Sequence, residues 1–158
     1  MRVVLDTNIL ARSVCSPRGP ARELVQRLTS GDHILLLSSF ILEELARVLR
    51  YDRIKIRHGL EDREIDNLLM NLQELGVVVD LSNKKLESSV PHDPDDDPIV
   101  HTAILGMADV LCTLDRDFEH SEVVILLEKQ SISLMSDVHS SHCSSKPMSQ
   151  YRCRANTA

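Results

Sequence analysis

The chain has 158 residues, an ordinary apolar fraction of 42% and a formal net charge of −6, which fits one domain that buries its own core. This net charge argues against a general electrostatic attraction to nucleic acid, and an aromatic fraction of 3% argues against binding dominated by stacked bases. No apolar run approaches the roughly 18 residues of a membrane helix, the first residues lack a signal-peptide pattern, and the four cysteines are widely scattered, so we expect a cytoplasmic protein with reduced thiols and no membrane contact.

Short apolar runs and helical patterns alternate along most of the chain. Predicted strands occupy residues 2–5, 33–38, 76–81, 110–114 and 132–135, and predicted helices occupy residues 21–28, 40–49, 62–75 and 99–107. The strands are continuously apolar, which favours a parallel sheet covered on both faces. We therefore predict an α/β protein, a three-layer α/β/α sandwich with a central parallel β-sheet, over residues 1–137 and a disordered polar tail over residues 138–158.

Two acidic residues in the first half of the chain are candidates for a site at the carboxyl edge of this sheet. Asp6 directly follows the first strand and precedes a Thr-Asn pair, where its side chain either shapes a turn or reaches a crevice. Glu44 shares a helical stripe with two apolar residues and is expected to face partly inward. Its neighbour Glu43 has Arg47 four residues on, which predicts an ordinary exposed ion pair.

The second half of the chain carries an acidic run and a further acidic strand end. The run DPDDDP, residues 93–98, places four carboxylates before an apolar helix, with Asp97 next to Pro98 at the expected helix start. One cap needs one carboxylate, so the excess negative charge modestly favours a bound cation. Asp115 follows a predicted strand, and Asp117 lies two residues on, where a surface turn is expected. The run does not match an EF-hand, which needs glycine and glutamate at positions where this chain has neither.

The predicted fold brings four of these acids to one crevice. Asp6, Glu44, Asp97 and Asp115 each stand at a strand end or near a helix start. Four carboxylates in one site resist ionising together unless a cation neutralises them. Hard divalent cations prefer oxygen ligands, and no histidine or cysteine with zinc spacing accompanies the acids. Mg²⁺ or Mn²⁺ is therefore the expected metal.

A local basic patch is the candidate for contact with a polyanion such as RNA. Residues 47–58 carry five cations against a single aspartate. The cations are Arg47, Arg50, Arg53, Lys55 and Arg57. The same pattern also fits a solvated helix end whose cations interact favourably with the helix dipole, and both interpretations stay open.

Four stretches of the chain resemble the PIN-domain family, in particular its bacterial members that are toxin components of toxin–antitoxin pairs. They are VVLDTNILARSV, LLLSSFILEELARVLR, DPDDDPIVHTAI and ADVLCTLDRDF, in the family's order and spacing over about residues 1–137. The resemblance implies roles for seven polar residues. The catalytic positions fall on Asp6, Glu44, Asp97 and Asp115, and the supporting positions fall on Asn8, Thr113 and Asp117.

The same resemblance implies a metal-dependent endoribonuclease that hydrolyses phosphodiester bonds of single-stranded RNA, as a toxin whose partner is an antitoxin protein. Asp6, Asp97 and Asp115 are then expected to bind the metal directly, and Glu44 to act through water or by orienting other groups. After ISLMSDV the chain becomes serine-rich where the family continues into a further helix. A homodimer is therefore left open.

Two other functions fit parts of the same pattern. A PIN-like scaffold that binds RNA or protein without cleaving would normally have a broken acidic quartet, and here the quartet is intact. A phosphotransferase of the haloacid-dehalogenase type also places a nucleophilic aspartate after its first strand. Such an enzyme requires a second aspartate two residues later, where this chain has Asn8.

Overall fold

The computed structural model describes residues 1–31, 33–82, 88–90 and 93–135, and the predicted tail at 138–158 lies outside these residues. A parallel five-stranded sheet forms the centre of the fold. Its strands, in spatial order, are β3 (Val77–Val78), β2 (Ile34–Leu37), β1 (Arg2–Leu5), β4 (Val110–Cys112) and β5 (Ser133–Met135). The predicted parallel sheet is confirmed.

The strand predicted at 76–81 forms over two residues only. β3 pairs with the end of β2, at Leu36 and Leu37, and β2 gives way to a helix two residues later. An edge strand cannot continue its ladder once its partner strand ends. β3 is therefore shorter than the apolar run predicts, because β2 ends beside it.

Seven α-helices connect and flank the strands in the described part of the chain. They are α1 (Thr7–Cys15), α2 (Pro20–Ser30), α3 (Ser39–Leu49), α4 (Asp52–His58), α5 (Asp62–Leu75), α6 (Asp97–Leu105) and α7 (Ser121–Lys129). Four of them match the predicted helices, whereas α1, α4 and α7 were not predicted. The sequence of α1 contains threonine, asparagine, valine, isoleucine and cysteine, whose intrinsic helix propensity is low. Packing of its buried face therefore decides its structure.

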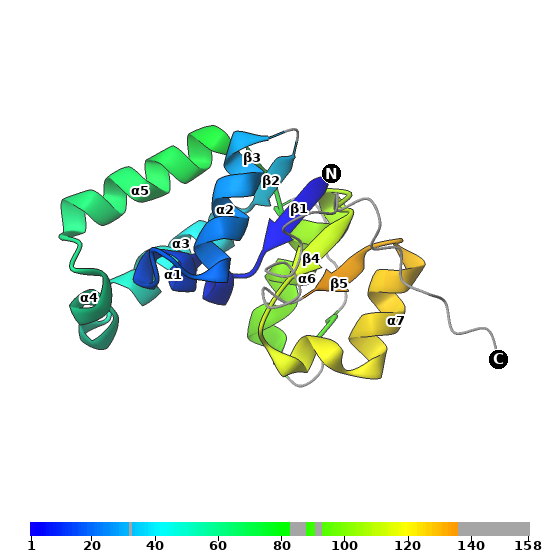
Figure 1. Ribbon diagram of the computed structural model, residues 1–158. Coiled ribbons are helices and arrows are strands. Elements are labelled where there is room, and N and C mark those ends of the chain that lie inside the picture. Colours follow the sequence, from blue (N-terminus) through cyan, green and yellow to red (C-terminus); the bar gives the residue numbers. More distant parts are fainter. Residues whose placement is uncertain (32, 83–87, 91–92, 136–158) are drawn as a thin grey trace.

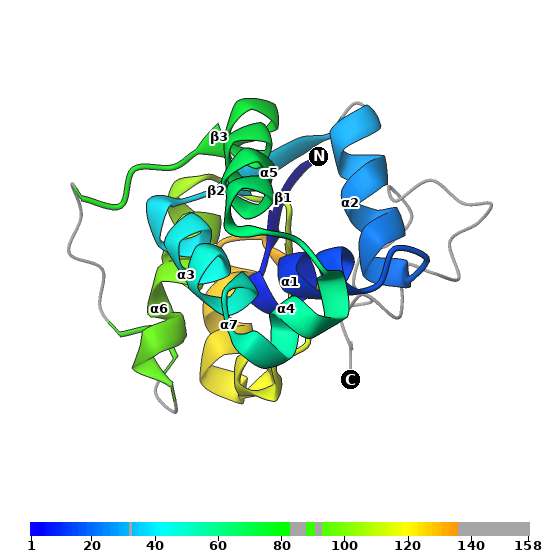
Figure 2. The same cartoon turned by 90° about the vertical axis from the view of Figure 1, so that its left-hand side faces the viewer.

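The helices form layers on both sides of the sheet. α6 packs against β1, β2 and β4 and against α3, while α2 packs against β2 and against α1. Figure 2 shows α2 on one side of the strands and α3 with α6 on the other, and Figure 1 shows β1 between β2 and β4 at the centre. The three-layer sandwich is thus confirmed. Leucine, isoleucine and valine dominate its core, and Phe118 is the largest fully buried side chain.

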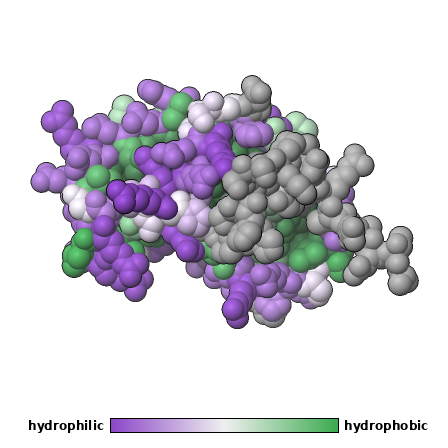
Figure 3. Space-filling view, viewed as in Figure 1, coloured by the Kyte–Doolittle hydropathy of each residue, from purple (hydrophilic) through white to green (hydrophobic). Residues whose placement is uncertain are grey.

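α4 and α5 project from this sandwich. α5 packs against α3 and buries only Ile65 and Leu72 along its length. The face shown in Figure 3 is mostly hydrophilic around these helices, with small hydrophobic areas between polar side chains. None of the helices in the described ranges has the length and apolarity needed to span a bilayer.

Candidate active site

An acidic cavity of about 190 Å³ opens where β1 and β4 end at the carboxyl edge of the sheet. After β1 the chain forms β2 and β3 on one side of β1, and it then forms β4 and β5 on the other side, so the strand order reverses at β1. This is the position at which open α/β sheets bind ligands. The cavity is lined by Asp6, Thr7, Asn8, Glu44, Val48, Asp96 and Asp115.

Asp6 is the most deeply placed of these acids, with 4% of its surface exposed. It is the N-cap of α1 and accepts a hydrogen bond from the backbone N–H of Asn8. Its Oδ2 accepts from Asn8 Nδ2 at 2.6 Å and from the Thr113 hydroxyl. Burial raises the pKa of Asp6 to about 6, aided by the charges of Glu44 and Asp115 and opposed by the bonds from Thr113 and Asn8.

Glu44 reaches the cavity from α3, whose start is fixed by the Ser38 hydroxyl accepting from the N–H of Ile41. Its Oε2 accepts a hydrogen bond from the Thr7 hydroxyl at 2.8 Å, and its Oε1 lies 3.6 Å from Arg47. The inward orientation predicted for Glu44 is therefore present. The predicted ion pair between Glu43 and Arg47 is wrong, because Arg47 contacts Glu44 instead.

The acidic run contributes Asp96 to the cavity, while the carboxylate of Asp97 has a different environment. Asp97 Oδ1 accepts from the backbone N–H groups of Ser89 and Val90, both at 2.7 Å. The run was predicted to cap the helix with Asp97, but α6 already includes Asp97, and Asp96 is the N-cap residue. The side chain of Asp96 makes no capping hydrogen bond, and Asp96 lines the cavity.

Asp96 has the most strongly perturbed carboxyl group of the cavity. Burial is the first cause that raises its pKa to about 7, followed by the charges of Asp6, Asp93, Asp115 and Glu44. These charges come from four separate segments of the chain, so part of the rise in pKa comes from acids that are distant in sequence and close in the fold. Sequence reasoning missed Asp96 itself, since the run offers several equivalent carboxylates and periodicity does not choose among them.

The segment after β4 supplies Asp115 to the cavity and Thr113 to the support of Asp6. Asp115 lines the cavity and is also the N-cap of a short 3-10 helix, Arg116–Glu119, because its side chain accepts a hydrogen bond from the N–H of Asp117 at 2.9 Å. Thr113 is buried, and besides donating to Asp6 it accepts from the N–H of Asp115 at 2.9 Å. The side chain of Asp117 lies 3.6 Å from His120 instead of lining the cavity.

The cavity fits a hard divalent cation by its chemistry. Its lining offers four carboxylates and one amide oxygen as ligands, and Mg²⁺ and Mn²⁺ prefer oxygen ligands of these kinds. Asn8 Oδ1 is buried and has no hydrogen-bond partner among the described residues, and a buried oxygen of this kind is stabilised by a cation or a bound water. No three acidic, histidine or cysteine groups of the described residues are gathered tightly enough to hold an ion as they stand. A cation would have to draw the repelling carboxylates together.

The predicted basic patch divides into paired and unpaired cations. Arg50 lies 2.5 Å from Asp66, and Lys55 lies 2.8 Å from Asp62, whose pKa it lowers. Both cations thereby join α3 and α4 to α5. Arg53 and Arg57 are exposed on α4, and neither has an ion pair with another described residue. These two arginines are the ones available to a phosphate.

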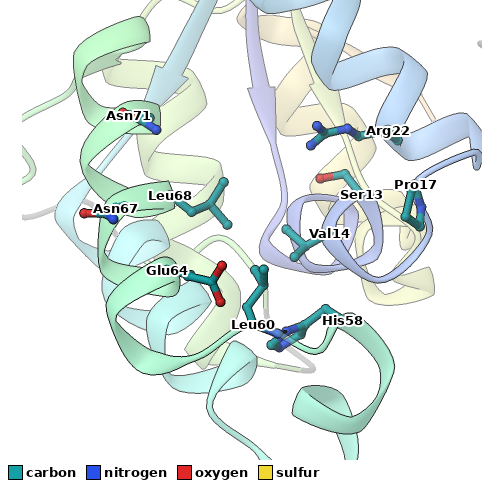
Figure 4. Close-up of a pocket in the computed structure, with 10 residues that line it drawn as sticks. All are labelled: Ser13, Val14, Pro17, Arg22, His58, Leu60, Glu64, Asn67, Leu68 and Asn71. Atoms are coloured by element: carbon teal, nitrogen blue, oxygen red, sulfur yellow. Dashed lines mark hydrogen bonds between the residues drawn. The ribbon is translucent and has the colours of Figure 1, made fainter.

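A second, larger cavity of about 440 Å³ lies between α5 and the pair formed by α1 and α2 (Figure 4). Leu60, Leu68 and Val14 supply apolar walls, with Arg22 and Glu64 among the polar groups around them. The acids of the first cavity are not among its lining residues.

Comparisons with known proteins agree with this architecture. The model of the PIN domain matches residues 2–117, and no curated protein matches the chain. The fold is similar to a chain in the crystal structure of VapBC2 from Rickettsia felis bound to a DNA fragment from their promoter, with a TM-score of 0.52, 15% sequence identity, and coverage of 86% of this chain and 98% of that chain. Because the PIN-domain match extends from the first strand past the last cavity acid, this chain belongs to the PIN-domain family.

Proposed function

We propose that this protein is a divalent-metal-dependent endoribonuclease that hydrolyses phosphodiester bonds of single-stranded RNA. The observation that carries the proposal is the single cavity lined by four carboxylates from four segments of the chain, Asp6, Glu44, Asp96 and Asp115. Burial first, and then the charges of the neighbouring acids, raise the pKa values of Asp6 and Asp96, and acids with raised pKa values are typical of functional sites.

The proposal departs from the sequence expectation at one position. Asp96 takes the metal-binding role expected of Asp97, because Asp96 lines the cavity while Asp97 Oδ1 binds two backbone N–H groups. Asp6 and Asp115 keep their expected roles as direct ligands. Asp97 is then a structural residue that fixes the segment at Ser89 and Val90 against the start of α6.

The residues of the chain would act by holding charge and orienting groups. A bound Mg²⁺ or Mn²⁺ supplies a water of lowered pKa and stabilises charge on the phosphate. Thr113 and Asn8 fix the carboxylate of Asp6 through hydrogen bonds. Glu44 lines the cavity from α3 and accepts a hydrogen bond from Thr7, so it would orient groups there or bind the metal through water. Arg53 and Arg57 would contact the RNA backbone, since they are exposed and have no acidic partner in the described structure.

We further propose that the protein is the toxin of a toxin–antitoxin pair, located in the cytoplasm. The support is the fold shared with a chain of the Rickettsia felis VapBC2 structure. The expected partner is an antitoxin protein. The experiment that tests this pairing is co-expression of the adjacent gene product, which should copurify and suppress cleavage. A homodimer is a further state to be examined by sedimentation.

Cleavage by the purified protein tests the proposed activity. Single-stranded RNA should be cut with Mg²⁺ or Mn²⁺ and left intact with EDTA. Asp6→Asn and Asp96→Asn should each abolish cleavage, since each removes a charge from the cavity at nearly constant shape. Asp95→Asn is the matched control, because Asp95 is exposed, adjacent to Asp96 and absent from the cavity lining.

Two outcomes would contradict the proposed activity, and a third would contradict the role of Asp96. Full cleavage by Asp6→Asn would remove the acidic cavity from the reaction. RNA binding without cleavage by the folded wild-type protein under all metal conditions would instead favour the non-cleaving scaffold. Equal loss of cleavage in Asp95→Asn and Asp96→Asn would refute the specific role given to Asp96.

A further inference from the structure

We propose that Thr7 is a positioning residue that holds the Glu44 carboxylate in the acidic cavity, an inference that rests on the proposed function. Thr7 is the first residue of α1 and has 4% of its surface exposed. Its hydroxyl donates to Glu44 Oε2 at 2.8 Å. The bond joins two helices that pack against each other, α1 and α3, at the wall of the cavity.

The two oxygens of Glu44 face different surroundings. Oε2 is directed to the buried hydroxyl of Thr7, whereas Oε1 lies 3.6 Å from the exposed guanidinium of Arg47. Arg47 also donates to the hydroxyl of Tyr51 at 2.9 Å and lies over its ring, so it is anchored outside the cavity. Arg47 therefore attracts the carboxylate outward, and Thr7 attracts it inward.

Electrostatic repulsion makes the inward contact important. Asp6, Asp96 and Asp115 line the same cavity as Glu44, so their carboxylates repel that of Glu44. The side chain of Glu44 is 25% exposed and has several rotatable bonds. Without the Thr7 hydroxyl, repulsion from the cavity and attraction to Arg47 act in the same direction. Glu44 would then turn toward solvent.

The expected consequence is a weaker metal site with an intact fold. Loss of a hydrogen bond to a charged group changes an equilibrium constant by about tenfold. This figure allows for water, which replaces part of the lost bond at a half-buried carboxylate. We expect Thr7→Val to weaken Mn²⁺ binding about tenfold. Thr7→Ser keeps the hydroxyl and should restore binding to nearly the wild-type value.

Mn²⁺ binding followed by electron paramagnetic resonance, together with cleavage over a range of Mn²⁺ concentrations, tests this inference. Ser13→Ala is the control, because it also removes a buried hydroxyl from α1, one that donates to Leu10 O and does not line the acidic cavity. It should bind Mn²⁺ as the wild type does. If Thr7→Val does not fold, Thr7→Ala carries the same test, since alanine is well tolerated in a helix.

A second comparison separates an effect through Glu44 from a general structural one. In a Glu44→Ala background, Thr7→Val should no longer change Mn²⁺ affinity, since the hydroxyl has lost its acceptor. Wild-type affinity in Thr7→Val, or an equal effect with and without Glu44, would overturn the inference while leaving the nuclease proposal intact. A wild-type protein that neither binds Mn²⁺ nor cleaves RNA would instead overturn the proposed function.

Discussion

Replacing Asp6 by asparagine should stabilise the metal-free protein more at pH 8 than at pH 4. Asp6 is 4% exposed, and its pKa is raised from 3.8 to about 6, chiefly by burial. A raised acid pKa means that the fold disfavours the ionised form. The wild-type protein therefore loses stability as the pH rises from about 4 to about 6, and the loss persists above that range.

The size of this effect follows from the two pKa values. The difference between 3.8 and about 6 corresponds to about 3 kcal/mol of unfolding free energy when the group is fully ionised. Asparagine offers one accepting oxygen where Asp6 uses two, a cost that does not depend on pH. We therefore expect the change between pH 4 and pH 8 to favour the variant by about 2 kcal/mol, or about 4–8 °C in Tm.

Thermal unfolding in EDTA, followed by circular dichroism at both pH values, measures this change. Asp95→Asn is the control, because the same chemical change at an exposed position should have a small effect at both pH values. If Asp6→Asn alters Tm equally at pH 4 and pH 8, the raised pKa of Asp6 is refuted, and with it the electrostatic description of the cavity.

Three other variants test separate parts of the structure. Thr113→Val should raise the pKa of Asp6 further, because the Thr113 hydroxyl lowers it, and a carbon-13 titration of the Asp6 carboxyl that does not move would contradict this. Replacing Arg53 and Arg57 together by glutamine should weaken RNA binding and make it less dependent on salt, and filter binding at several salt concentrations would expose an unchanged salt slope. Ile65→Ala should cost about 2–5 kcal/mol in a denaturant titration, since Ile65 is fully buried; Mn²⁺ affinity should be retained, and its loss would place α5 in the metal site.

The sheet was predictable because its strands are apolar runs that are long enough for a buried strand and short for a helix. All five were located, and their parallel pairing followed from continuous apolarity. The helix α1 was not predicted, because six of its nine residues have low intrinsic helix propensity. Its start depends on Asp6, which also lines the cavity. A side chain that serves as both cap and cavity acid gives a weak sequence signal for either role.

The acidic cavity was predictable in its location and less so in its membership. Asp6, Glu44 and Asp115 stand beside strand ends or on a helix face that the fold had to bring together. Asp96 was missed because the choice between it and Asp97 depends on the residue at which α6 begins. Thr7 was missed because its role depends on how α1 packs against α3.

The limited packing of α5 has a consequence for local opening of the structure. α5 buries two side chains and is joined to its neighbours by surface ion pairs involving Arg50 and Lys55, whose contribution to stability is small. The lining of the acidic cavity contains no residue of α4 or α5. Amide hydrogens of these two helices should therefore exchange with deuterium through a partial unfolding event that leaves β1, β4 and their carboxylates protected.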